Sequence, residues 1–133
     1  MHVQPYLFFD GRCEEAIAFY TQSVGAKTEV VMRYKDSPDK SMCAPGNENK
    51  VMHACIKIGD TQIMASDGQA KGKPNFDGFA LSITAKDGTE AKARFDALSD
   101  GGAVVMPLAK TFFAAQFGMV KDRFGVHWMV LAQ

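Results

Sequence analysis

The stretch PYLFFDGRCEEAIAFYTQSVGA, residues 5–26, decides the fold of this chain. It opens with aromatic and aliphatic residues at 6–9, which suit a strand buried on both faces of a sheet. Asp10 is placed to cap the helix that follows, and Gly25 is placed to end it. The apolar residues of this helix recur at helical spacing and are Cys13, Ala16, Ile17, Tyr20 and Val24. The stretch therefore predicts a strand, a tight turn and an amphipathic helix.

The second half of the chain opens in the same way with GFALSITAKDGTEAKARFDALSDGGA, residues 78–103. Asp87 and Glu90 have the spacing of a capping box at the start of a helix. The apolar stripe of this helix consists of Ala91, Phe95 and Leu98. A unit used twice in 133 residues predicts two similar modules.

The segments that follow each helix are typical of strands. These segments are 27–34, 51–58, 61–67, 103–110, 114–122 and 126–132. Gly59-Asp60 marks a hairpin turn, and Pro107 predicts an edge strand or a bulge. Residues 35–50 are polar and predict a long loop.

The element order is therefore βαβββ, twice, which is an α+β fold. We expect a single domain over residues 1–133. Module one covers about 1–67, the connection about 68–77, and module two about 78–133.

Composition limits the classes of partner. Fifteen basic residues balance fifteen acidic ones, which argues against nucleic acid as a partner. The sequence has no apolar run of about 18 residues that could span a membrane, and it has no signal-peptide pattern. Three cysteines without paired spacing favour a reducing compartment, so we expect a cytoplasmic location.

In PYLFFDGRCEEAIAFY, MASDG and KDRFGVHWMV the chain resembles the vicinal oxygen chelate superfamily, which includes glyoxalase I, bleomycin-resistance proteins and extradiol dioxygenases. These motifs are similar to those of the PhnB-like branch, often labelled 3-demethylubiquinone methyltransferase-like. The resemblance implies two modules curled into a cup, with paired modules, commonly in a homodimer, closing the ligand cavity. The methyltransferase label has no support here, because no glycine-rich strand–helix loop of the kind that cradles a nucleotide-like cofactor is present.

The resemblance also implies a divalent metal held by four cup-facing positions. Alignment of the motifs places Pro5, Met64, Gly78 and Met129 there. Proline and glycine offer no side-chain donor, and a thioether is a poor ligand for hard divalent ions. We therefore expect no family metal and no other cofactor.

Two histidines are candidates for a site. His127 lies two residues from Met129, so strand alternation places both on the cup-facing side with Leu131. His127 can act as a general base or anchor an anionic ligand, or it can be a hydrogen-bonded strand histidine. His53 alternates with Cys55; such a pair could bind a soft metal, but it supplies only half a site. A solvated or helix-covered strand face is the alternative.

Other candidates are polar or apolar side chains near the expected cup. Ser66 and Asp67 can place a hydroxyl and a carboxylate at its rim, or form a turn in which Asp67 binds nearby backbone. Phe117 can line an apolar pocket or fill the core. The ligand-binding candidates are His127, Met129, Met64, Ser66, Asp67, Phe117 and His53.

Three functions fit these residues. The first is binding of a small molecule in the cup without the family metal. The second is a metal-dependent or acid–base enzyme of the same superfamily, of the lyase, isomerase or dioxygenase type. The third is a protein whose modules serve mainly to form a homodimer. The residues leave open which ligand is bound and whether any reaction is catalysed.

Overall fold

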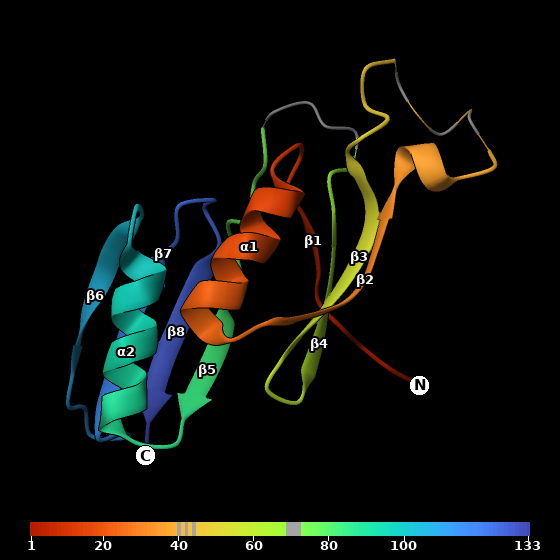
Figure 1. Cartoon of the computed structure of the whole chain (residues 1–133). Helices are drawn as coiled ribbons and strands as arrows, with labels where there is room; N and C mark the ends of the chain where they lie inside the picture. Colours follow the sequence, from red (N-terminus) through yellow and green to blue (C-terminus); the bar gives the residue numbers. More distant parts are fainter. Residues whose placement is uncertain (40, 42, 44, 69–72) are drawn as a thin grey trace. The chain divides into compact units, whose positions relative to one another are not determined.

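The computed structural model describes residues 1–39, 41, 43, 45–68 and 73–133, which fold as two units, Met1–Pro74 and Asn75–Gln133 (Figure 1). Each unit contains one α-helix and one four-stranded mixed sheet with the same connectivity. The predicted α+β fold of two βαβββ modules is confirmed. Residues 40, 42 and 44 of the predicted loop, and residues 69–72 of the predicted connection, lie outside the described residues.

Unit 1 is built around α1 and the strands that follow it. Its elements are β1 (Tyr6–Phe8), α1 (Cys13–Val24), β2 (Lys27–Arg33), the 3-10 helix η1 (Tyr34–Asp36), β3 (Val51–Ile58) and β4 (Thr61–Ser66). The strand order is β1-β4-β3-β2, with β1 parallel to β4 and the other pairs antiparallel. α1 contacts β2 and β3 and buries its predicted apolar stripe. Gly25 ends the helix with a φ of 70°, in the left-handed region that favours glycine.

Unit 2 repeats this arrangement around α2. Its elements are β5 (Leu81–Ala85), α2 (Gly88–Ser99), β6 (Ala103–Ala109), β7 (Gln116–Lys121) and β8 (His127–Ala132). The strand order is β5-β8-β7-β6. β6 is an edge strand whose pairing with β7 is irregular on both sides of Met106, as the proline at position 107 predicts.

One face of the unit 2 sheet packs against α2. A Cβ at Gly118 would lie 2.6 Å from Cε2 of Phe95, so only glycine lets helix and strand approach this closely. Gly118 pairs with Val130 across the strands, which places Val130 on the same helix-covered face. Trp128 and Val130 are buried. By alternation His127, Met129 and Leu131 point to the opposite face, which confirms the predicted register of the last strand.

Two local predictions for the start of the chain are wrong. Phe8 is 57% exposed, because α1 covers one face of the unit 1 sheet and strand alternation turns Phe8 to the other. Asp10 does not cap α1. It has a φ of 54°, and its Oδ2 accepts a hydrogen bond from the backbone N–H of Lys73 instead.

No helix among the described residues is both long enough and apolar enough to cross a membrane.

Candidate functional site

The open face of the unit 2 sheet, which is the face away from α2, carries an apolar surface. Met129 lies between Ser82 on β5 and Met119 on β7, and Leu131 lies between Thr84 and Phe117 in the same way. Cross-strand partners share a face, so these side chains are neighbours. The ring of Phe113 lies 5.1 Å, centroid to centroid, from that of Phe117. We call Phe113, Phe117, Met119, Met129 and Leu131 the unit 2 shelf; Phe113 is 53% exposed, whereas Phe117 is 7% exposed and forms part of the core.

A polar pair marks one end of this shelf. Nε2 of His127 lies 3.2 Å from Oδ1 of Asp77, and the two side chains are 25% and 71% exposed. Lys121 is the cross-strand partner of His127. The structure therefore brings the predicted residues His127, Met129 and Phe117 onto one face. It adds Asp77, which sequence reasoning missed because 50 residues separate it from His127.

The open face of the unit 1 sheet has a different chemistry. The hydroxyl of Tyr6 lies 3.1 Å from Nδ1 of His53. Met64 pairs with Tyr6 on one side and with Cys55 on the other, so all four side chains share this face. Sγ of Cys55 donates to Oε1 of Glu29 at 3.5 Å. Burial first, and the hydrogen bond to Glu29 second, raise the pKa of the Cys55 thiol.

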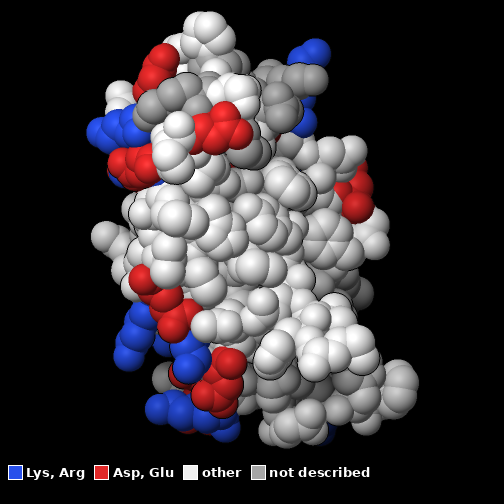
Figure 2. Space-filling view, turned by 90° about the vertical axis from the view of Figure 1, so that its right-hand side faces the viewer, with Lys and Arg blue, Asp and Glu red and all other residues white. Residues whose placement is uncertain are grey.

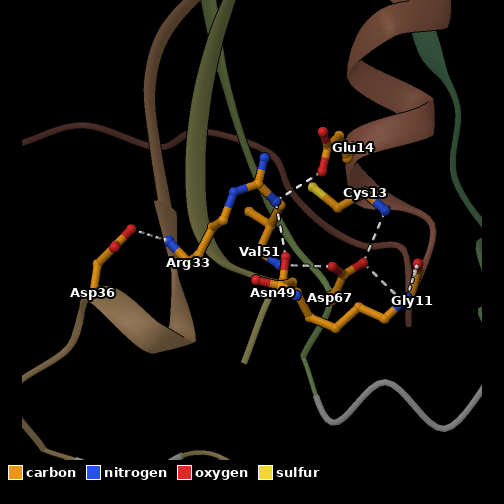
Figure 3. Close-up of polar contacts among 9 residues, drawn as sticks. Gly11, Cys13, Glu14, Arg33, Asp36, Asn49, Val51 and Asp67 are labelled. Carbon is orange, nitrogen blue, oxygen red and sulfur yellow. Dashed lines mark hydrogen bonds and ion pairs between the residues drawn. The ribbon is translucent and has the colours of Figure 1, made fainter. Parts of the chain in front are cut away.

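Asp67 does not lie at a rim. It is 1% exposed, and its carboxylate accepts hydrogen bonds from three backbone N–H groups (Figure 3). Oδ1 accepts from Gly11 at 2.9 Å and from Cys13 at 2.8 Å, while Oδ2 accepts from Val51 at 2.8 Å. Ser66 is also buried, and its hydroxyl accepts from the backbone N–H of Gly68. Asp67 holds the start of α1 and of β3 in place, Ser66 supports the backbone at Gly68, and neither buried side chain is available to a ligand.

The neighbour of Asp67 at the helix start is an inert thiol. Cys13 is fully buried, and burial, with a smaller contribution from the Asp67 carboxylate, raises its pKa to about 12. A fully buried thiol that stays protonated is a poor nucleophile, and no ligand or metal ion can reach it from solvent. Cys13 is therefore part of the core.

Arg33 ties the end of β2 to the same helix start (Figure 3). Its Nη1 donates to Oε2 of Glu14 at 2.7 Å and to the carbonyl of Asn49 at 2.8 Å. The hydrogen bond from the guanidinium lowers the pKa of Glu14. These contacts support the loop between β2 and β3, and we assign them a structural role.

The family's metal positions, held here by Pro5, Met64, Gly78 and Met129, lie on or just before strands β1, β4, β5 and β8. The carbonyl of Pro5, just before β1, accepts from the N–H of Met64, and Gly78 precedes β5 with a φ of 90°. Met64 and Met129 lie partly exposed on β4 and β8. In the part of the chain that the structure describes, no three His, Cys, Asp or Glu side chains are grouped so as to hold a metal ion. The absence of the family metal stays a prediction.

Two units of this connectivity define a protein of the glyoxalase/bleomycin-resistance fold. A glyoxalase-related enzyme from Fulvimarina pelagi shares the fold with a TM-score of 0.65 at 15% identity, covering 100% of this chain and 88% of that one. A family model described as 3-demethylubiquinone-9 3-methyltransferase matches residues 1–131. The chain therefore belongs to this family, as the PhnB-like motifs indicate.

Relatives that match over nearly the whole of both chains support this assignment. Protein YjdN of Escherichia coli is 33% identical, and the match covers 98% of this chain and 94% of that protein. The crystal structure of protein PA1353 from Pseudomonas aeruginosa has a TM-score of 0.88 at 40% identity, covering 100% and 98% of the two chains. A structure titled as a putative 3-demethylubiquinone-9 3-methyltransferase, PhnB protein, from Bacillus cereus has a TM-score of 0.84 at 27% identity, covering 100% of both chains.

Proposed function

We propose that the protein binds a small molecule on the open face of the unit 2 sheet, without the family metal. The unit 2 shelf takes an apolar part of the ligand, and His127, held by Asp77, takes an anionic group. The observation that carries this proposal is the position of the His127–Asp77 pair at the end of a row of apolar side chains, of which Met119, Met129 and Leu131 are partly exposed. An apolar wall with a few convergent polar groups is the usual composition of a small-molecule site.

The charges around His127 favour an anion over a cation. Lys121 lies across the strand from His127, so its ammonium group and, in the protonated form of the ring, the Nδ1–H of His127 can both donate to the ligand. Asp77 supplies the opposing charge, and its contact with Nε2 fixes the orientation of the imidazole ring.

One probe that matches this chemistry is anilinonaphthalene sulfonate, which joins two aromatic groups to one anionic group. We expect a single saturable site per chain by fluorescence titration, and loss of that site in Met129→Glu, which puts a charge in the centre of the shelf. Val3→Glu is the matched control, since Val3 is 94% exposed near the N-terminus. A wild-type protein without a saturable site, or a Met129→Glu variant that binds as tightly as Val3→Glu, would contradict the proposal.

The same His127–Asp77 pair favours one second candidate, an acid–base enzyme. A carboxylate that orients an imidazole is a common arrangement for a general base. Native mass spectrometry of freshly purified protein, with metal analysis, compares the two candidates. A retained compound recovered unchanged supports binding, whereas conversion of that compound by wild type but not by Asp77→Asn supports catalysis.

We also propose that the protein forms a homodimer. The edge strands β2 and β6 each expose consecutive apolar residues, Val30–Met32 and Val104–Met106, at 38–54% of their surface. On the side of the molecule drawn in Figure 2, where β2 and β3 lie in Figure 1, charged side chains gather mainly toward the upper and lower ends. Edge strands with consecutive exposed apolar side chains favour pairing with another chain. Sedimentation at micromolar concentration should show a dimer, and a monomer alone would contradict this proposal.

A further inference from the structure

Four soft donor side chains meet on the open face of the unit 1 sheet. His53 and Cys55 alternate on β3 and therefore point the same way. Met32 on β2 is the cross-strand partner of His53, and Met64 on β4 is the partner of Cys55. The two methionines thus flank the His–Cys pair from opposite sides, and none of the four side chains is fully buried.

We propose that His53, Cys55, Met32 and Met64 form a binding site for a soft monovalent metal ion, Cu(I) or Ag(I). Thiolate and thioether sulfur select Cu(I) over hard divalent ions, and imidazole is a good additional ligand. The proposed ion is monovalent, whereas the superfamily's metal is divalent. Of the four proposed ligands, only Met64 stands at one of the family's metal positions. It does not rest on the proposed function of unit 2.

The register of the sheet places each methionine directly opposite one member of the His–Cys pair. Directly opposite residues on neighbouring strands have Cβ atoms about 4.5–5.5 Å apart. Methionine has three rotatable bonds, so each sulfur can swing toward the centre of the group. The sequence shows only the His–Cys half of the site, because the two methionines join it through strand register.

The Tyr6 hydroxyl orients the imidazole ligand. It lies 3.1 Å from Nδ1 of His53, so Nδ1 can donate its proton to the tyrosine oxygen and leave Nε2 free for the metal. Metal-ligating histidines almost always have such a partner on the second nitrogen.

Binding exchanges one proton for the ion and transfers no electron. The Cys55 S–H bond breaks as the metal–sulfur bond forms, and the proton goes to Glu29, whose Oε1 already accepts from Sγ at 3.5 Å, or to water. The ion enters and stays in its monovalent state, so no oxidant or reductant is needed.

The test is an anaerobic titration of the full chain with Cu(I) against a chromophoric chelator, with Ag(I) in native mass spectrometry as a redox-inert second probe. We expect one ion per chain. Cys55→Ser should abolish that complex, while Cys43→Ser, the matched control at another partly exposed thiol, should keep it. Far-UV circular dichroism of each variant shows whether it is folded.

Two further variants separate the four-donor site from a lone thiol. Met32→Leu and Met64→Leu keep the side-chain volume but remove the sulfur, and each should weaken binding, while Tyr6→Phe should weaken it by about 10-fold. The proposal is overturned if wild type does not compete with the chelator, if Cys55→Ser still binds one ion, or if Cys43→Ser loses it. Unchanged affinity in both methionine variants also overturns it. Dye binding to unit 2 should be the same in Cys55→Ser and wild type.

Discussion

The two helices of this protein begin in different ways. At the start of α2, the side chain of Asp87 accepts a hydrogen bond from the N–H of Glu90, three residues further along. At the start of α1, the side chain of the N-cap residue Arg12 does not cap the helix backbone, and Asp67 from the far end of unit 1 accepts hydrogen bonds from the N–H groups of Gly11 and Cys13 instead. The first cap stabilises a helix alone, whereas the second also joins that helix to β3 and β4.

A buried aspartate in unit 2 sharpens this contrast. Asp122 is 3% exposed, and its Oδ1 accepts from the N–H groups of Phe124 and Val126, while Oδ2 accepts from Nε1 of Trp128. Asp67 and Asp122 thus each bind three N–H donors, two on one oxygen and one on the other. Asp122 closes the turn between β7 and β8, but Asp67 joins segments that are far apart in the sequence.

The largest effect is expected for Asp67→Asn, at about 3–4 kcal/mol of unfolding free energy. The asparagine oxygen can keep two N–H donors, but its amide group faces the third. The charge that favours the positive end of α1 is also lost. Asp122→Asn loses one acceptor without a helix terminus nearby, so about 2 kcal/mol is expected. Urea denaturation measures the unfolding free energy of both variants. A larger loss for Asp122→Asn than for Asp67→Asn would contradict the difference inferred between the two aspartates.

A smaller effect follows from the thiol beside Asp67. The folded chain holds the pKa of Cys13 at about 12, against 9.0 as the ordinary value. Because the folded pKa is raised, this stabilisation is complete below 9.0 and is lost as pH rises toward 12. Between about pH 8 and pH 10 the loss from this group is about 1.4 kcal/mol.

Denaturation curves of wild type and Cys13→Ala across that range isolate this contribution. The alanine variant should lose about 1.4 kcal/mol less than wild type on raising the pH, although its stability at neutral pH is lower. Parallel curves for the two proteins would show that Cys13 ionises freely in the folded state.

The smallest of these stability effects is expected for the local cap of α2. Asp87→Ala removes one hydrogen bond at the helix start and should cost about 1 kcal/mol. Asp96→Ala is the matched control on the same helix, since its ion pair with Lys92 is exposed and contributes at most about 0.5 kcal/mol. Equal losses in the two variants would show that Asp87 stabilises the helix no more than a surface charge does.

These contrasts explain what could be predicted from the sequence. The element order, the Asp87 cap, the irregular edge strand around Pro107 and the register of His127 all follow from patterns within a few residues. Asp10 is the nearest acidic residue before α1 in the sequence, yet the carboxylate that accepts from the helix start is that of Asp67, because tertiary packing decides which acceptor reaches these N–H groups.

The same distinction between local sequence patterns and tertiary contacts applies to the candidate sites. Strand alternation placed His127 and Met129 together, and it placed His53 with Cys55. The partners that give these residues their chemistry came from pairing between strands and from a distant loop, namely Asp77, Tyr6, Met32 and the neighbours of Met64. Such pairings depend on register across the sheet, which local patterns do not encode.

The most direct test of the proposed site is the affinity of His127→Ala for anilinonaphthalene sulfonate. Removal of the imidazole that receives the sulfonate should weaken binding by about 10-fold, the equivalent of one lost hydrogen bond to a charged group. The stability in urea should change little, because His127 is partly exposed. His2→Ala is the control, since His2 is exposed and lies before the first strand. An affinity in His127→Ala equal to that of His2→Ala and wild type would contradict the account.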